Sequence, residues 1–172
     1  MRLVIVIVGL VLLIGCAKEP LAVYSDRGVV EIVPIDSTVP FSVPDEGDEG
    51  WHWYDPGVGS RDVKLKLKEK IGRPVWINSI QWDLFDIEGD RVATGVEPIV
   101  PPLEIGGGRD TTYTLILEVK EGYAQALDKA DGHEDYSGKG YYRFTPSGKD
   151  VERGVDIGIV EGYLEIMVRK AD

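Results

Sequence analysis

Polar and apolar residues alternate along much of the chain, which is the pattern of β-strands with one buried face. In VKLKLK, residues 63–68, the apolar residues fall on one face and the three lysines fall on the other. Residues 75–86 continue this alternation, but its phase changes near Asn78 and Ser79, which predicts a bulge or a bend. We therefore expect two consecutive strands with a turn between them.

Shorter segments with the same alternation, separated by turn residues, predict further strands. Turn chemistry is strongest at Glu88-Gly89-Asp90 and at Gly106-Gly107-Gly108. Only Tyr123 to Ala130 predicts a helix, of one or two turns. The further predicted strands are 29–33, 91–94, 111–119, 141–145, 155–160 and 163–169.

Seven or eight short strands with almost no helix predict an all-β fold, an antiparallel immunoglobulin-like β-sandwich. A small closed barrel is the alternative. We place the sandwich at residues 62–172, because residues 16–61 contain five prolines and two clusters of glycine and acidic residues. Proline at that density disfavours helices and interior strands, so residues 16–61 are predicted to be a tether with one short strand.

The first 15 residues form a separate segment. Arg2 is followed by the apolar or glycine residues Leu3 to Ile14, which as a helix would span about 18 Å against a hydrocarbon core of about 30 Å. One positive charge, an apolar run of this length and then small residues are typical of a secretory signal peptide. Leu13-Ile14-Gly15-Cys16 resembles the lipobox of prokaryotic lipoproteins, in which an aliphatic residue and a small one precede a cysteine.

This resemblance implies that the chain is cut before Cys16, the only cysteine, and that diacylglycerol on its thiol anchors the protein to a membrane. Two or three acyl chains hold a protein firmly, at roughly 0.8 kcal/mol per buried methylene. Ala17 lacks the acidic signal for inner-membrane retention. The implied location is the cell membrane or the outer membrane, with the folded domain on the extracytoplasmic side. An uncleaved apolar anchor and a cleaved, secreted form with a free thiol are the alternatives.

Residues 62–119 also resemble the LEA14/water-stress family of immunoglobulin-like sandwich domains. The matching segments are VKLKLKEKIGRPV, then EGDRVATG, then LEIGGGRDTTYTLIL. The Asn-Pro pair common in that family is absent, and Gly72-Arg73-Pro74 stands at the comparable turn. The resemblance implies the fold of this part of the chain and no particular activity.

The charge of the chain argues against a nucleic-acid partner. Its 19 basic and 30 acidic residues give a formal charge of −11, and loss of residues 1–15 would remove only Arg2. Phosphate binding needs clustered Lys and Arg. The densest basic run, Lys64, Lys66, Lys68 and Lys70, alternates with apolar residues. We therefore interpret it as the solvent-facing side of a strand, with an anion-binding stripe as the alternative.

The sequence contains no recognisable catalytic motif. His52 and His133 belong to neither an H-x-x-H nor an H-E-x-x-H motif, and there is no G-x-S-x-G elbow, phosphate loop or G-x-G-x-x-G. Two acidic clusters, residues 45–49 and 131–135, lack the spacing of a calcium loop. We interpret both as solvated loops, with calcium binding as the alternative. No catalytic residue, cofactor or metal ligand is predicted; the covalent lipid on Cys16 is the only attached group.

GWHWYDPG, residues 50–57, is the most unusual local feature of the sequence. Trp51, Trp53 and Tyr54 could form a platform for a glycan or a peptide, because aromatic faces stack on sugar rings and prolines. The alternative is an edge strand whose indoles cover one end of the sandwich. Trp82 is in phase with Ile80 and Leu84, so we expect it in the core.

Together these observations predict a membrane-anchored lipoprotein that acts as a non-catalytic binding or assembly module of the cell envelope. Its expected partners are the membrane, through the lipid, and an envelope protein or a glycan. The alternative is an anchored hydrolase or metal-dependent enzyme that uses the acidic loops and His52 or His133. A purely structural spacer is a third possibility.

Overall fold

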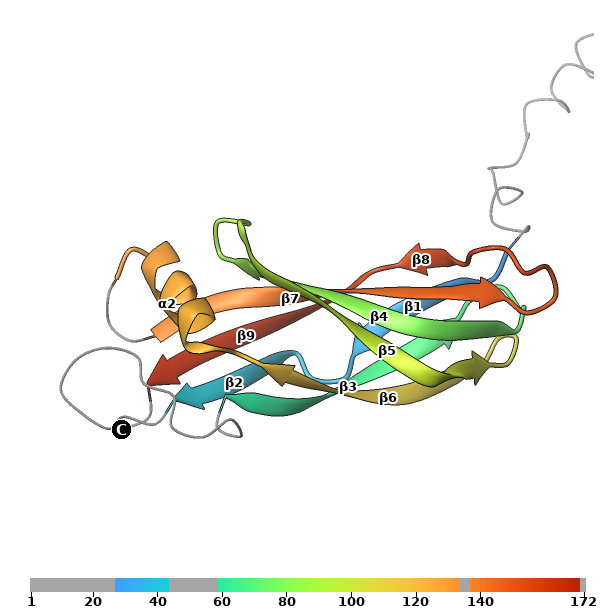
Figure 1. Ribbon diagram of the computed structural model, residues 1–172, viewed down its shortest axis with the longest axis horizontal. Helices are drawn as coiled ribbons and strands as arrows, with labels where there is room; N and C mark the ends of the chain where they lie inside the picture. The colour runs from blue at the N-terminus through green and yellow to red at the C-terminus, as the bar shows by residue number, and fades with distance from the viewer. Residues whose placement is uncertain (1–26, 44–58, 134–136, 171–172) are drawn as a thin grey trace, which may run out of the picture.

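The computed structural model describes residues 27–43, 59–133 and 137–170, which form nine strands and one helix. The elements are β1 (Val29–Pro34), β2 (Thr38–Val43), β3 (Ser60–Glu69), β4 (Val75–Asp86), β5 (Arg91–Ile105), β6 (Asp110–Glu118), α2 (Glu121–Ala130), β7 (Ser137–Asp150), β8 (Gly158–Val160) and β9 (Gly162–Lys170). A four-stranded sheet has the order β6-β3-β1-β8, and a five-stranded sheet has the order β2-β9-β7-β4-β5 (Figure 1). The fold is therefore all-β and sandwich-like, as predicted. The strands of the described residues form two separate sheets and do not close into a barrel.

The N-terminal strand region is divided between the two sheets. β1 pairs antiparallel with β3 and parallel with β8, whereas β2 pairs parallel with β9. The prediction that all strands pair antiparallel is therefore wrong for two pairs, β1 with β8 and β2 with β9. The reason is that the chain crosses from one sheet to the other after β1, so that β1 and β2 each lie beside one of the last two strands. Both sheets are mixed.

β1 and β2 lie within the segment that the sequence assigned to a tether, yet each is an integral strand of a sheet. The alternation in Thr38–Val43 is interrupted by Pro40, which hid this strand from sequence analysis. Proline is tolerated there because β2 is an edge strand and half of its backbone groups need no partner.

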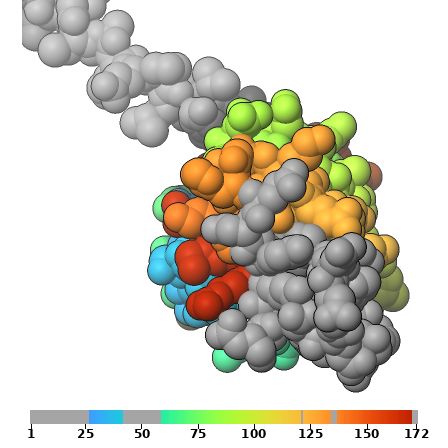
Figure 2. Space-filling view, turned by 90° about the vertical axis from the view of Figure 1, so that its left-hand side faces the viewer, coloured from blue at the N-terminus to red at the C-terminus, as the bar shows by residue number. Residues whose placement is uncertain are grey.

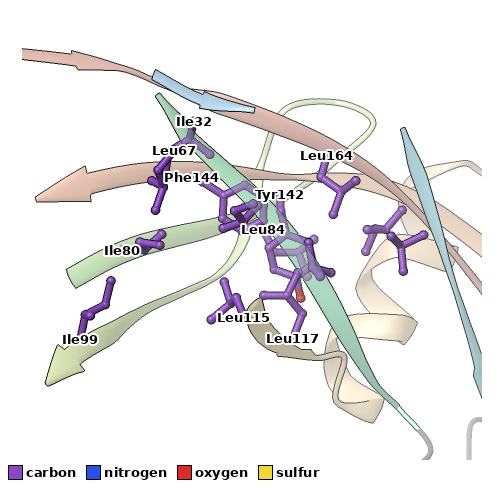
Figure 3. Close-up of a cluster of buried hydrophobic side chains, with 14 of the residues drawn as sticks. Ile32, Leu67, Ile80, Leu84, Ile99, Leu115, Leu117, Tyr142, Phe144 and Leu164 are labelled. Atoms are coloured by element: carbon purple, nitrogen blue, oxygen red, sulfur yellow. The ribbon is translucent and has the colours of Figure 1, made fainter. Parts of the chain in front are cut away.

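The core lies between the two sheets, where the inward-facing side chains of nearly every strand meet (Figure 3). Its largest fully buried members come from both layers. They include Ile32, Leu65, Leu67, Leu115 and Leu117 from the four-stranded sheet and Phe41, Ile77, Ile80, Leu84, Tyr142 and Phe144 from the five-stranded sheet. The apolar residues that alternate with polar ones in the sequence are therefore the ones that form the core.

Tyr142 and Trp82 are in contact within this core. The Tyr142 hydroxyl donates a hydrogen bond to the backbone carbonyl of Glu118 at 3.4 Å, which gives this buried polar group a partner. Trp82 is only partly buried, but it packs against the core and meets the Tyr142 ring edge to face at a centroid distance of 5.7 Å.

Buried carboxylates fix the turns between strands. Glu69 accepts hydrogen bonds from the backbone N–H groups of Ile71, Gly72 and Arg73 at 2.7 to 3.1 Å, and from Gly108 in the β5–β6 turn at 2.7 Å. One side chain thus joins two turns that are far apart in the sequence. Asp150 plays the same part for the β7–β8 turn and for Gly28.

Most of the remaining predicted elements overlap elements of the structure, but three strands differ in length. β7 has 14 residues where residues 141–145 were predicted, and β8 has three residues where residues 155–160 were predicted. The bulge expected near Asn78 and Ser79 is present as a register shift between Ile77 and Ser79, and the predicted helix is α2. β5, by contrast, extends over 15 residues, where four were predicted. β5 contains three prolines and accommodates them because it is an edge strand.

Candidate functional site

An open groove of about 600 Å³ lies on the outer face of the five-stranded sheet, at the end where α2, β2 and β9 gather. Figure 2 looks onto this end, where the blue atoms of β2, the red atoms of β9 and the orange atoms of α2 and the start of β7 lie next to one another. The groove is lined by Thr38, Ile87, Lys139, Gly140, Tyr141, Tyr163, Glu165, Ile166 and Met167.

Strand alternation explains why these side chains reach the outer face. In β7 and β9 every second residue is buried in the core, and the residues between them face away from it. Register then brings the outward residues of neighbouring strands side by side. Arg143 lies between Asp83 of β4 and Tyr163 of β9, and Tyr141 lies between Phe85 and Glu165.

An aromatic row crosses three strands of this face. The Phe85 and Tyr141 rings are stacked, with centroids 5.1 Å apart and an interplanar angle of 14°. The Tyr141 and Tyr163 centroids are 6.1 Å apart and their planes are tilted by 51°. Tyr163, at the β9 end of the row, is 57% exposed to solvent.

A buried ion pair supports the aromatic row. Asp83 is fully buried although it points to the outer face of the sheet, and its Oδ2 accepts a hydrogen bond from Arg143 Nη2 at 2.9 Å. The Arg143 guanidinium lies 5.0 Å above the centre of the Phe85 ring, a cation–π geometry. Arg91 Nη1 is 3.6 Å from Asp83 Oδ1. Asp83 therefore fixes an arginine that covers the first ring of the row.

The pKa of Asp83 reflects two opposing effects. Burial raises it, because desolvation disfavours the carboxylate, but hydrogen bonds from Arg143, Thr94 and Gln81 and the charge of Arg143 outweigh burial. The net pKa lies below the usual value for aspartate. Asp83 is thus a carboxylate at neutral pH and acts as a structural anchor.

The groove itself combines apolar surface with one charge of each sign. Ile87 and Met167 are about half exposed, and Lys139 and Glu165 flank the Tyr141 and Tyr163 rings. The Tyr163 hydroxyl donates a hydrogen bond to Glu161 at 2.8 Å, which raises the pKa of the phenol. Such a surface suits a ligand that offers both C–H groups and hydroxyl groups, because rings bind the former and charged side chains bind the latter.

Most of the residues that the sequence singled out lie outside the described residues. This applies to the lipid-attachment residue Cys16, to the platform of Trp51, Trp53 and Tyr54, and to His52 and the acidic cluster 45–49. These predictions stay predictions.

His133 is described, and the structure leaves it exposed, with its backbone N–H bonded to Asp131 Oδ1 at 3.0 Å. Within residues 27–43, 59–133 and 137–170, no three His, Cys, Asp or Glu side chains are grouped as metal ligands. Nor does any helix in that part of the chain have the length and apolar character needed to cross a membrane.

The lysine run occupies the face that its alternation predicted. Lys64 is exposed, and Lys66 and Lys68 point to the same outer face of the four-stranded sheet. Lys66 forms an ion pair with Asp110 at 2.7 Å, and Lys70 forms one with Glu31 at 2.9 Å. Acidic neighbours thus interrupt the positive stripe.

Sequence analysis did not single out the groove. A usable signal was present, because Phe85, Tyr141 and Tyr163 are aromatic residues in the solvent-facing phase of their strands, where polar residues are the norm. Their juxtaposition depends on the register of β4, β7 and β9, which a single sequence does not determine.

Comparison with known proteins bears on the fold alone. No protein-family model and no curated protein matches the chain. The solution structure of a putative late embryogenesis abundant protein is similar, with 20% identity, a TM-score of 0.50, and coverage of 88% of this chain and 76% of that chain. This likeness agrees with the family resemblance noted in residues 62–119, and it extends well beyond them.

Two further solved structures are more distantly similar. A crystal structure of a protein from Archaeoglobus fulgidus has 13% identity and a TM-score of 0.45, over 70% of this chain and 94% of that chain. The apo-form Calx CBD1 domain has 13% identity and a TM-score of 0.38, over 83% of this chain and 98% of that chain.

Proposed function

We propose that this protein is a lipid-anchored, non-catalytic binding module of the cell envelope that holds a glycan in the groove on its five-stranded sheet. The observation that carries the proposal is the exposed Tyr163 ring beside Tyr141, in an open groove with Glu165 and Lys139. The groove offers aromatic, apolar and charged side chains side by side, which is a surface suited to binding.

A sugar chain fits the chemistry of the groove. The face of a tyrosine ring carries negative potential and attracts the C–H groups of a pyranose ring. The carboxylate of Glu165 accepts hydrogen bonds from hydroxyl groups, and the ammonium of Lys139 donates them. The groove is open to solvent, so a bound sugar can be part of a longer chain.

The charge of the protein favours an uncharged glycan. A formal charge of −11 repels polyanions such as acidic polysaccharides. We therefore expect neutral oligosaccharides to bind more tightly than acidic ones of the same length.

The aromatic row is held in place before any ligand arrives. Asp83 holds Arg143 through an ion pair, and the Arg143 guanidinium covers the Phe85 ring. The Phe85 ring in turn stacks on Tyr141. Fewer side chains then lose freedom when the ligand binds, which favours affinity.

The binding test uses the full chain in detergent on an array of neutral and acidic oligosaccharides. Tyr163→Ala should weaken binding of the selected glycan at least about tenfold, the loss expected when a stacked ring worth about 1.4 kcal/mol is removed. Tyr163→Phe, which keeps the ring, should retain most of the affinity. Trp76→Ala is the matched control, because Trp76 is an exposed aromatic residue of the same sheet outside the groove. Equal binding by wild type and Tyr163→Ala would contradict the proposed site.

The anchor is tested separately by metabolic labelling with radioactive palmitate. Wild-type protein should be labelled and Cys16→Ser should not, because serine cannot form the thioether. Label that persists in Cys16→Ser would overturn the lipoprotein proposal and would leave the glycan proposal untouched.

A further inference from the structure

We propose that β6 is the dimerisation edge of this protein, and that it pairs antiparallel with β6 of a second copy to form a continuous eight-stranded sheet. The proposal is independent of the glycan groove, which lies on the other sheet. It rests on a comparison of the four sheet edges in the described part of the chain and on the register that one of them permits.

An exposed edge strand invites pairing with another chain, and proteins usually blunt such edges with proline, lysine, bulges or short strands. Three of the four edges carry one of these devices. β2 contains Pro40, and β8 has only three residues. β5 contains Pro98, Pro101 and Pro102 and has two register shifts against β4.

β6 has none of these devices. Its sequence DTTYTLILE contains no proline, lysine or arginine, and it pairs with β3 over nine consecutive positions without a register shift. No strand of the described residues pairs with its other side. Threonine, tyrosine and isoleucine favour strands, so this edge is regular and well suited to accept a further strand.

The direction of the backbone groups of β6 follows from two hydrogen bonds at the ends of its pairing with β3. The N–H of Glu69 donates to the carbonyl of Arg109, and the N–H of Val119 donates to the carbonyl of Gly59, each at 2.9 Å. In an antiparallel pair such residues alternate with residues whose backbone groups face away. The N–H and C=O groups of Thr112, Thr114 and Ile116 therefore point to the open side.

A second copy is the occupant that the sequence of the edge favours. Pairing two β6 strands about Leu115 sets Asp110 of each copy, which also pairs with Lys66 of its own chain, opposite Lys120 of the other copy. The same register sets Ile116 opposite Thr114. The backbone at Lys120 is still extended (φ −77°, ψ 158°). Ile116, now 63% exposed, would be covered in both copies. Pairing about Thr114 would instead oppose Asp110 and Glu118, which are both acidic.

The test measures the mass of the full chain in detergent by sedimentation equilibrium. Wild type should be a dimer. Thr114→Pro should shift it to monomer, because proline removes an N–H that faces the open side and leaves the bonds to β3 intact. Thr114→Val, which keeps the N–H, is the matched control and should remain a dimer. Circular dichroism and the unfolding midpoint establish that each variant is folded.

Charge reversal tests the register without touching the backbone. Lys120→Asp should weaken dimerisation about tenfold, because it places a second acidic residue opposite Asp110 twice in the dimer. Asp110 is left unchanged in this test because it also pairs with Lys66 of its own chain. Lys120→Arg, which keeps the positive charge, is the matched control and should remain a dimer. A wild-type protein that stays monomeric at the highest attainable concentration, or a dimer that Thr114→Pro leaves intact, would overturn the proposal; binding of a different protein's extended segment to a monomeric β6 would do the same.

Discussion

At the scale of single residues, the buried carboxylates divide into two kinds. Glu69 and Asp150 accept backbone hydrogen bonds in turns and join distant segments of the chain. Asp83 lies instead under the aromatic face and pairs with Arg143 and Arg91. The first kind holds the fold together, and the second shapes the surface on which we place the ligand.

The ion pair beneath the aromatic face should behave as a coupled unit. Asp83→Ala removes the carboxylate that accepts the hydrogen bond of Arg143, and we expect it to lower the free energy of unfolding by about 1–3 kcal/mol. Asp83→Leu combined with Arg143→Leu should cost less than the sum of the two single leucine changes, because neither member of the pair is left behind without the other. Urea unfolding measures wild type, Asp83→Ala, the two single leucine variants and the double variant.

Glu31→Ala is the control for this cycle, because it breaks the more exposed ion pair with Lys70 and should cost less than about 1 kcal/mol. Additive effects of the two changes at positions 83 and 143 would show that the pair does not act as a unit.

The protonation of Asp150 should make the fold sensitive to acid. Burial raises the pKa of this carboxyl. The opposite effect is larger and comes from backbone hydrogen bonds of Arg153, Gly28 and Glu152 and from the charge of Arg73. The net pKa is therefore below the usual value for aspartate. The unfolded chain then binds protons more readily than the folded one. The stabilisation is present above the unfolded pKa of about 3.9 and is lost as the pH falls through the folded pKa.

Urea unfolding between neutral pH and pH 2 measures this dependence. Asp150→Asn should be less stable than wild type at neutral pH and should lose less stability between about pH 4 and pH 2. If the two proteins lose the same free energy over that interval, Asp150 does not contribute to the acid sensitivity.

At the scale of strands and turns, alternation in the sequence predicted most of the fold correctly. It gave β1, β3, β4, β6, β9 and α2 to within a few residues, together with the bulge near Ser79 and the turn glycines. β2 and most of β5 escaped because proline interrupts them, and proline signals an edge strand as well as a loop. The aromatic face escaped because it is assembled from strands whose register the sequence does not specify.

Close packing between paired strands β4 and β5 makes Gly95 indispensable. A Cβ atom on Gly95 would lie 2.3 Å from Cζ2 of Trp82, and a real carbon cannot approach an indole that closely. Gly95→Ala should therefore lower the free energy of unfolding by about 1–3 kcal/mol through displacement of Trp82. The difference in tryptophan fluorescence between wild type and Gly95→Ala reports the displacement of Trp82, and the unfolding midpoint reports the loss of stability.

Gly122→Ala is the matched control, because nothing lies within 4 Å of a Cβ there and alanine favours the helix by up to about 1 kcal/mol. This variant should be at least as stable as wild type. A Gly95→Ala protein with wild-type stability would mean that Trp82 moves aside without cost.

At the scale of the whole molecule, the sandwich presents two chemically different outer faces. The four-stranded sheet displays lysines that alternate with core residues, whereas the five-stranded sheet displays aromatic rings over a buried ion pair. An exposed apolar face rimmed by charged residues is a common feature of binding surfaces. We therefore assign ligand binding to the five-stranded sheet and dimerisation to the β6 edge of the other.

The most direct test of the binding face is a titration of the isotope-labelled protein with the neutral glycan selected on the array, followed by amide chemical shifts. The account predicts that the largest changes fall on Lys139, Tyr141, Tyr163 and Glu165, with the amides of β1 and β3 unaffected. Changes confined to the four-stranded sheet would contradict the account, as would the absence of any change at saturating glycan.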